Sequence, residues 1–236
     1  MSLSRTEIAW NEASQVKAIA VVSQKGGAGK TTLALHIAVA AERAGLSAAI
    51  LDMDPQGTAE RWSEWRREEP PAVVAAKAVT LGRRLEQAEA GDGDLVVIDT
   101  PPLAQTEARE AARVADLILI PCRPSAFDLD AIRITADLAN DIGKPAFVVV
   151  NAGPPQGTSV YKDVAEVVGR FGLRVAPARL AERAAFRHAV RDGKSVQELE
   201  PDGKAAEEVA TLWDWISGQL GILKSGNQVI LTKATT

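Results

Sequence analysis

A glycine-rich segment that contains two lysines constrains this chain more than any other feature of its sequence. The segment follows the apolar run Ala18–Ser23, precedes the helically spaced segment Thr31–Ala44, and reads Lys25-Gly26-Gly27-Ala28-Gly29-Lys30-Thr31-Thr32. Glycines let the backbone wind tightly with its N–H groups pointing inward, and the following helix adds the positive end of its dipole. A strand, such a loop and a helix in this order predict a phosphate-binding P-loop, although a glycine-rich turn without a ligand is the alternative.

The side chains of this loop fit a nucleotide that carries a magnesium ion. We expect the Lys30 ammonium to neutralise the β- and γ-phosphates, and the Thr31 hydroxyl to be a Mg²⁺ ligand. The remaining phosphate contacts would come from Gly26, Gly27, Ala28, Gly29 and Thr32. The sequence therefore predicts a nucleotide site at the start of the chain.

Alternating apolar runs and helically spaced segments predict the fold. The apolar runs are Ala18–Ser23, Ala48–Asp52, Leu95–Asp99, Leu117–Pro121 and Phe147–Asn151. Further helices are expected at Ala59–Glu68, Glu107–Val114, Leu129–Ile142, Val160–Phe171 and about Lys204–Leu220. Runs without polar alternation are typical of strands that are buried on both faces. We therefore predict one α/β domain with a doubly wound, mostly parallel sheet.

The expected boundaries are an extension at 1–17, the domain at 18–221 and a tail at 222–236. In the tail, Gln228–Thr232 could form an edge strand or belong to a disordered end.

Carboxylates follow two of the predicted strands. Asp52-Met53-Asp54-Pro55-Gln56-Gly57 places two of them after the second strand, and Asp99 ends the next strand before Thr100-Pro101-Pro102. Open α/β sheets bind their ligands at the carboxyl ends of strands. Asp99 is expected to hold Mg²⁺ through a water molecule. A strand-end turn at Asp54 and a structural cap at Asp99 are the alternatives.

These motifs, in this order, resemble the ParA/MinD ATPases with a deviant Walker A motif, in particular small ParA-type positioning ATPases. The resemblance implies that Lys25 reaches across a nucleotide-sandwiched dimer to the partner's phosphates. It also implies that Asp54 orients the attacking water while Asp52 supports the Mg²⁺ or the loop network. Two later residues match the family loosely: Asn151 could contact the adenine edge and Pro177 could pack on the base, although a strand-end cap and a turn are equally simple readings.

The segments Pro121-Cys122-Arg123-Pro124-Ser125 and Phe127-Asp128-Leu129 also resemble ParA sequences, and only a structural or interface role is assigned to them.

The resemblance implies an ATPase that dimerises on ATP, binds non-specific duplex DNA and positions a plasmid, a chromosome or a protein assembly. A ParB-like or adaptor protein would stimulate its hydrolysis. The formal net charge of -4 means that DNA binding needs a local basic face. A candidate face, with Arg183, Arg187 and Arg191 at its centre, comprises Arg170, Arg174, Arg179, Arg183, Arg187, Arg191, Lys194 and Lys204. A solvated surface of mixed charge is the alternative.

Other classes fit less well. A MinD-like ATPase on a membrane surface needs an amphipathic C-terminal helix, and Ser225–Thr236 lacks a broad apolar face with a basic rim. Cys122 is the only cysteine, too few for the shared cluster of an iron protein of nitrogenase type. A metabolic P-loop kinase would leave Lys25 without a role. The single cysteine and the absence of an apolar signal core predict a cytoplasmic protein. The resemblance implies that it is associated with the nucleoid when ATP is bound, and no stable association with a membrane is expected.

Overall fold

The computed structural model describes residues 16–67, 69–156, 159–225 and 228–231 of the chain. Its centre is a seven-stranded sheet in the order β3-β2-β4-β1-β5-β6-β7, in which every pairing is parallel. The strands are β1 (Lys17–Val21), β2 (Ala48–Asp52), β3 (Ala72–Ala75), β4 (Leu95–Asp99), β5 (Leu117–Cys122), β6 (Ala146–Val150) and β7 (Arg174–Val175). This arrangement confirms the predicted single α/β domain with a doubly wound sheet.

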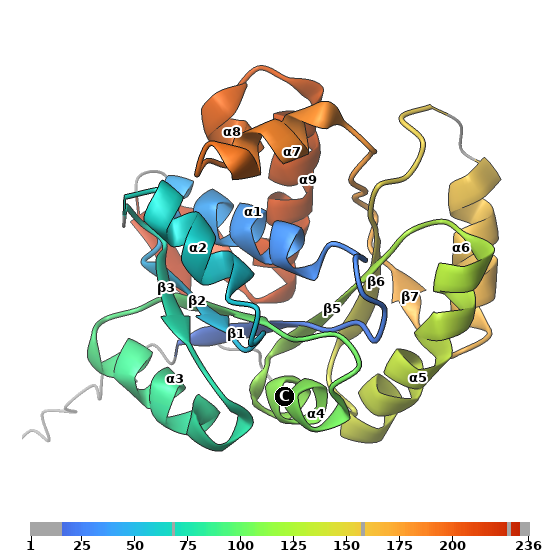
Figure 1. Cartoon of the computed structure of the whole chain (residues 1–236), viewed down its shortest axis with the longest axis horizontal. Coiled ribbons are helices and arrows are strands. Elements are labelled where there is room, and N and C mark those ends of the chain that lie inside the picture. The colour runs from blue at the N-terminus through green and yellow to red at the C-terminus, as the bar shows by residue number, and fades with distance from the viewer. Residues whose placement is uncertain (1–15, 68, 157–158, 226–227, 232–236) are drawn as a thin grey trace, which may run out of the picture.

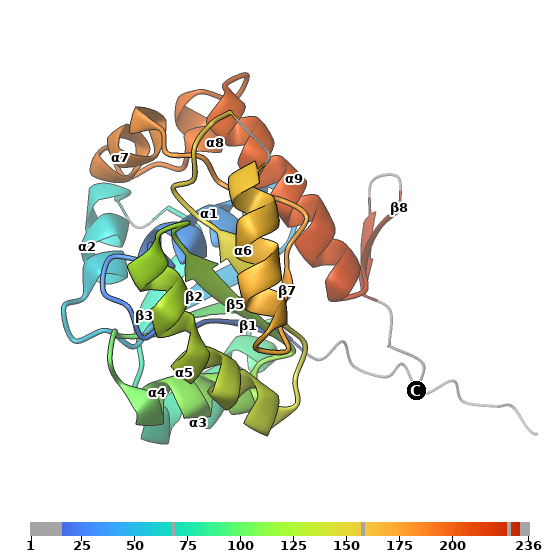
Figure 2. The same ribbon diagram turned by 90° about the vertical axis from the view of Figure 1, so that its right-hand side faces the viewer.

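Helices cover both faces of the sheet (Figure 1). One layer contains α1 (Lys30–Arg43), α2 (Thr58–Trp65), α7 (Ala184–Arg191), α8 (Val196–Leu199) and α9 (Lys204–Gln219). The other layer contains α3 (Leu81–Ala90), α4 (Gln105–Val114), α5 (Ala126–Ile142) and α6 (Ser159–Gly169), and a 3₁₀ turn, η1 (Ala78–Thr80), precedes α3. Figure 2 shows the two layers from the side, with α9 running along the edge of the first.

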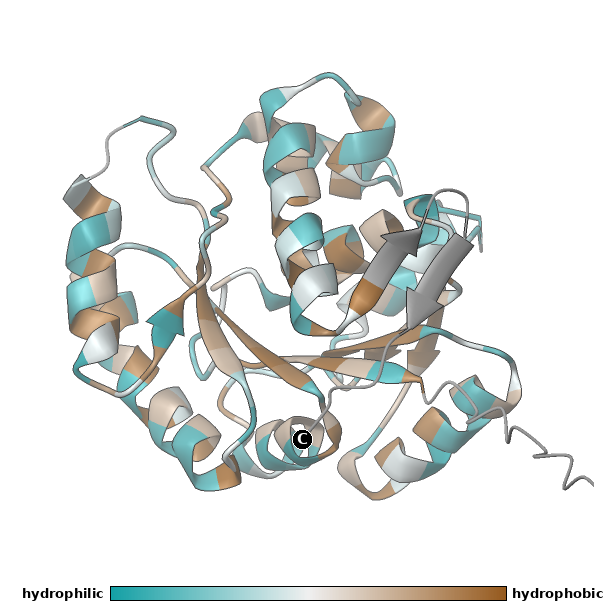
Figure 3. Cartoon of the chain, turned by 180° about the vertical axis from the view of Figure 1, so that it is seen from behind, coloured by the Kyte–Doolittle hydropathy of each residue, from teal (hydrophilic) through white to brown (hydrophobic). Residues whose placement is uncertain are grey.

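The strands supply alternate side chains to two separate cores. Ile19, Val97 and Leu119 pack with α1 and α9, whereas Ala20, Ile98 and Ile120 pack with α4 and α5. Successive residues of a strand point to opposite faces, so a strand covered on both sides must be apolar throughout. This explains the unbroken apolar runs in the sequence and the brown strands between the helices in Figure 3.

The central strands and the long helices lie where the sequence places them, to within a few residues. The structure adds β3, β7, α3, α7 and α8, which the sequence analysis did not predict. The last helix ends at Gln219, one residue before the expected end. After it, β8 (Ile222–Ser225) pairs antiparallel with β9 (Gln228–Leu231), so Gln228–Leu231 forms a separate hairpin and not an edge strand of the main sheet. Residue 232 and the extension at 1–15 lie outside the described residues.

Candidate nucleotide-binding site

The parallel sheet gathers the predicted site residues at one edge. The P-loop follows β1, Asp52 and Asp99 are the last residues of the neighbouring strands β2 and β4, and Asn151 follows β6. Asp52 and Asp99 are paired in register across the two strands. An open cavity of about 340 Å³ at this edge is lined by Gly27, Gly29, Lys30, Thr31, Thr32, Asp54, Pro102 and Arg123. Strand order changes direction around β1, which is the position where open α/β sheets bind ligands.

Two glycines of the loop have backbone conformations that other residues rarely adopt. Gly27 has φ of 72° and Gly29 has φ of 94°. Asn151 holds the loop from the far side: its Nδ2 donates a hydrogen bond to the Ala28 carbonyl oxygen at 2.8 Å. A Cβ atom on Gly29 would lie only 2.0 Å from that Nδ2 atom. Gly29 is therefore required both for its positive φ and for the close approach of Asn151.

Lys30 begins α1 and is buried beneath the loop. Its Nζ donates to the Lys25 carbonyl oxygen at 3.3 Å. Burial lowers the pKa of Lys30, while the nearby carboxylates of Asp99 and Asp54 raise it. A buried cation with few protein partners is suited to an anionic ligand in the adjoining cavity.

Asp99 provides the observation that tests the predicted magnesium site. The carboxylate is 1% exposed, and neither of its oxygens has a hydrogen-bond partner among the described residues. Burial raises the pKa of Asp99 to about 7, although the Thr31 hydroxyl and the Lys30 ammonium lower it. A buried carboxylate with so few partners is neutralised either by a proton or by a cation. Thr31 and Asp99 therefore fit Mg²⁺, which proteins usually bind through one or two carboxylates plus phosphate oxygens and water.

The two aspartates after β2 differ in their surroundings. Both oxygens of Asp52 are used by the backbone: Oδ1 accepts from Asp54 N at 2.9 Å, and Oδ2 accepts from Ala59 N at 2.9 Å and Glu60 N at 3.3 Å. Asp52 thus caps α2 and shapes the loop, and burial raises its pKa. Asp54 lines the cavity, and its Oδ1 accepts from Gln56 N at 2.9 Å. Of the two, Asp54 is the carboxylate that a ligand can reach.

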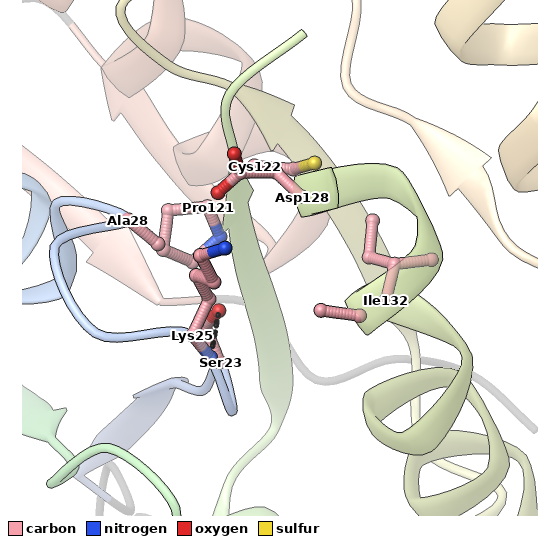
Figure 4. Close-up of a pocket in the computed structure, with 8 residues that line it drawn as sticks. Ser23, Lys25, Ala28, Pro121, Cys122, Asp128 and Ile132 are labelled. Atoms are coloured by element: carbon pink, nitrogen blue, oxygen red, sulfur yellow. Dashed lines mark hydrogen bonds between the residues drawn. The ribbon is translucent and has the colours of Figure 1, made fainter. Parts of the chain in front are cut away.

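Lys25 lies beside a second, much smaller cavity. This cavity, of about 10 Å³, is also lined by Ser23, Ala28, Pro121, Cys122, Asp128, Ala131 and Ile132 (Figure 4). The Lys25 side chain forms no ion pair with any described residue, and it is half-buried on its own subunit. The Cys122 thiol has its pKa raised to about 12 by burial and by Asp128, which agrees with a packing role for this side chain.

The two residues that the sequence predicts to contact adenine, Asn151 and Pro177, do not line the P-loop cavity. Besides holding Ala28, Asn151 accepts a hydrogen bond from Ala152 N at its Oδ1, at 3.0 Å, so both ends of its amide have protein partners. Pro177 is exposed just after β7 and is not among the residues that line the cavity. The geometry shows Asn151 as a support of the P-loop and leaves a contact with the base as a prediction.

Several basic residues of the C-terminal third have acidic or aromatic partners. Arg183 makes a 2.6 Å ion pair with Glu208, Arg170 pairs with Glu166, and Arg174 and Arg179 lie over the rings of Phe147 and Tyr161. Arg187 and Arg191 remain exposed, with long or local ion pairs to Glu182 and Asp192. They border an apolar groove between α2 and α7 together with Thr32, Trp65, Phe186 and Val190. Lys194 and Lys204 are exposed as well, without an ion pair among the described residues, so the candidate DNA face stays a prediction, with Arg187 and Arg191 as its most accessible arginines.

Two residues of the site have contacts that the sequence analysis did not identify. Thr100 donates from its buried hydroxyl to the Val21 carbonyl oxygen at 2.8 Å and so joins the end of β4 to β1. Arg123, to which only a structural or interface role was assigned, lines the same cavity as the P-loop. Its position directly after a buried strand was the signal that could have identified it.

Comparison with known proteins agrees with this geometry. Residues 19–196 match the CobQ/CobB/MinD/ParA nucleotide binding domain. The chain is 30% identical, over 80% of its own length and 91% of the relative's, to the maintenance of carboxysome distribution protein A of Halothiobacillus neapolitanus.

Solved structures share the fold. An ATP complex of a Cyanothece McdA variant superposes with a TM-score of 0.71 at 18% identity, covering 90% of this chain and 99% of that chain. The MinD cell division protein of Aquifex aeolicus superposes with a TM-score of 0.68 at 17% identity, covering 86% and 98%. Among the described residues, no helix is long and apolar enough to cross a bilayer.

Proposed function

This chain belongs to the ParA/MinD family of nucleotide-binding ATPases, and we propose that it is a positioning ATPase that dimerises on Mg-ATP, binds DNA without sequence preference and releases it after hydrolysis. One observation carries the nucleotide part of the proposal. At the end of β4, the buried Asp99 carboxylate is close enough to Thr31 and Lys30 for both to lower its pKa, and among the described residues no well-formed hydrogen bond satisfies it. That arrangement is suited to a cation held against phosphates.

The proposed catalytic roles follow from the positions of the side chains. Lys30 and the loop N–H groups hold the phosphates of ATP, while Thr31 and Asp99 hold Mg²⁺, with Asp52 fixing the loop that carries Asp54. Bound Mg²⁺ supplies charge neutralisation on the terminal phosphates. Asp54, which faces the cavity, orients the attacking water, and phosphoryl transfer depends mainly on such positioning.

Self-association is the proposed output of nucleotide binding. Lys25 has no ion-pair partner among the described residues and lies at the rim of the loop, so its ammonium is available to the phosphates of a second subunit. We propose that ATP favours this homodimer because the γ-phosphate adds negative charge between two subunits that each contribute a lysine.

DNA binding is proposed for the dimer and not for the single subunit. One subunit has a net charge of -4, whereas a dimer would double the number of phosphate contacts. Two subunits would place two copies of Arg187 and Arg191, whose side chains are 71% and 73% exposed, at the disposal of phosphates. Affinity should fall steeply with salt and should be similar for unrelated sequences. Arg183 is unsuitable for testing this face because its change would break the ion pair with Glu208.

The cargo is proposed to be a protein assembly, with a plasmid or a chromosome as the alternatives. The similarity to a protein named for carboxysome distribution supports this choice. An adaptor protein, ParB-like in function, would stimulate hydrolysis, and the cycle would take place in the cytoplasm on the nucleoid. A MinD-like cycle on a membrane surface is the second candidate, supported by the similarity of fold to MinD.

Retention on DNA tests the proposal. The parent protein, with ATP and Mg²⁺, is passed over immobilised duplexes of two unrelated sequences and, separately, over anionic vesicles. We expect retention on both duplexes with ATP and loss of retention with ADP. The Arg187→Glu and Arg191→Glu variants should be retained less on both. The matched control is Arg113→Glu on α4, an arginine that is 62% exposed on the opposite layer. Retention on vesicles and not on DNA would instead support the MinD-like cycle.

A further inference from the structure

Arg123 has a fixed backbone, and its side chain has no hydrogen-bond or ion-pair partner among the described residues. It directly follows β5, the strand next to β1. The Cys122 carbonyl oxygen accepts from Asn151 N at 2.9 Å, and the Arg123 carbonyl oxygen accepts from Ser125 N at 2.8 Å. The guanidinium, in contrast, makes no hydrogen bond and no ion pair with any described residue. The backbone hydrogen bonds therefore fix the position of Arg123, while its guanidinium stays available to a ligand.

That place is the phosphate cavity. The charged side chains that line it are Lys30, Asp54 and Arg123, alongside Gly27 and Gly29 of the loop. A nucleoside triphosphate carries more negative charge than Lys30 and a magnesium ion together neutralise. A guanidinium has a planar fork of donors that matches two phosphate oxygens, which an ammonium does not.

We infer that Arg123 is a phosphate-contacting residue that strengthens the binding of ATP more than that of ADP. The inference rests on the proposed nucleotide site and extends it by a side chain from β5. Arg123 is exposed, and no hydrogen bond or ion pair with a described residue accounts for an arginine at this position. The triphosphate has more charge and more oxygens for Arg123 to contact than the diphosphate. We therefore expect Arg123 to strengthen the binding of ATP more than that of ADP.

The experiment is a calorimetric titration of a non-hydrolysable ATP analogue and of ADP, each with Mg²⁺, into four proteins. These are the parent, Arg123→Ala, Arg123→Lys and the control Arg133→Ala. Arg133 is an exposed arginine on α5 that, within the described residues, has no ion pair and lines none of the cavities above. The titrations are repeated in the Lys25→Ala background, so that altered dimerisation is not mistaken for altered phosphate binding.

We expect Arg123→Ala to bind the ATP analogue about tenfold more weakly than the parent, which is the effect of losing one charge-assisted contact. ADP should lose less, and Arg123→Lys should recover part of the affinity. The salt dependence of binding should be shallower in Arg123→Ala. Thermal unfolding of the nucleotide-free variant should match the parent, because no hydrogen bond or ion pair to a described residue is lost.

Equal affinities of Arg123→Ala, Arg133→Ala and the parent for the ATP analogue would overturn the inference while leaving the nucleotide site intact. An equal loss for ATP and ADP would overturn the claimed preference. If the parent itself binds neither nucleotide, the proposed function fails, and the inference fails with it.

Discussion

The side-chain amide of Asn151 and the backbone of Ala28 are joined by a 2.8 Å hydrogen bond that connects the end of β6 to the P-loop. The two residues are far apart in sequence, and the contact fixes the loop between its two positive-φ glycines. The fit is close enough that no side chain is tolerated at Gly29. The bond therefore gives the loop a support that is independent of bound nucleotide.

Removing this support should weaken nucleotide binding without changing base selectivity. Asn151→Ala loses a hydrogen bond of about 1 kcal/mol, so we expect roughly a fivefold loss of affinity, equal for ATP and for triphosphates with other bases. The control is Asn140→Ala, which removes an exposed amide bonded to the Phe171 carbonyl oxygen at 3.0 Å and should leave affinity unchanged. A loss confined to ATP would instead identify Asn151 as a reader of adenine.

Two glycine substitutions separate backbone strain from steric collision. Gly27→Ala introduces a Cβ that meets nothing within 4 Å, so only its φ of 72° is penalised, by about 1 kcal/mol. Gly29→Ala adds the collision with Asn151 and should abolish measurable nucleotide binding. Titration of both variants with ATP checks that Gly29→Ala loses more nucleotide affinity than Gly27→Ala. Similar behaviour of the two variants would show that the Asn151 contact does not constrain the loop.

The buried Asp99 predicts a particular pH dependence of stability. Its pKa is raised from 3.8 to about 7, so between these values the folded state binds more protons than the unfolded state. The contribution of this group is therefore complete below about pH 4 and is lost as the pH rises to about 7, by up to roughly 1.4 kcal/mol per pH unit.

Denaturant unfolding of the parent and Asp99→Asn, without Mg²⁺ or nucleotide, isolates this effect. His36 acts in the opposite direction, because burial lowers its pKa to about 4, and subtracting the variant removes that contribution. We expect the parent to lose stability relative to Asp99→Asn as the pH rises from 4 to 7. A difference that does not change with pH would contradict the buried, unpartnered carboxylate.

A buried ion pair connects α2 to α8. The Arg66 guanidinium donates to both oxygens of Glu198, at 2.8 and 2.6 Å, and to the Gly193 carbonyl oxygen at 3.2 Å. Removing Arg66 leaves the half-buried Glu198 carboxylate without its cation and also removes the bond to the Gly193 carbonyl oxygen, so Arg66→Met should destabilise the fold by about 3 kcal/mol. Arg170→Met, which breaks an exposed pair of equal 2.6 Å length, should cost under about 1 kcal/mol. Comparable costs for both variants, measured by urea unfolding, would refute this distinction.

Sequence reasoning succeeded where the signal is local. The buried strands and the P-loop are continuous in sequence, whereas β3 spans only Ala72–Ala75 after two prolines and β7 has two residues. Helix α3 is mostly polar with Leu81 as its one fully buried residue, so its apolar periodicity is weak. These elements are defined by what they pack against, and such partners are distant in sequence.

The site shows the same limit. The motifs predicted the loop and both aspartate segments, but the partners of Arg183 and Asn151 are Glu208 and Ala28, which only the fold brings close. The sequence therefore could not tell which arginines of the cluster are paired, as Arg183 is, and which are exposed. The position of Arg123 after a buried strand places it at the carboxyl edge of the sheet, but only the strand order, with β5 next to β1, shows that it lies at the P-loop cavity.

The central claim is that nucleotide state controls self-association through Lys25. Sedimentation of Asp54→Ala with Mg-ATP measures it most directly, since slow hydrolysis should accumulate the ATP-bound form. We predict a mass of about twice 25.0 kDa with ATP and a single-chain mass with ADP. Adding Lys25→Ala to this variant should return the ATP-bound protein to the single-chain mass. An Asp54→Ala protein with the same mass in both nucleotides, or a dimer that persists without Lys25, would contradict the account.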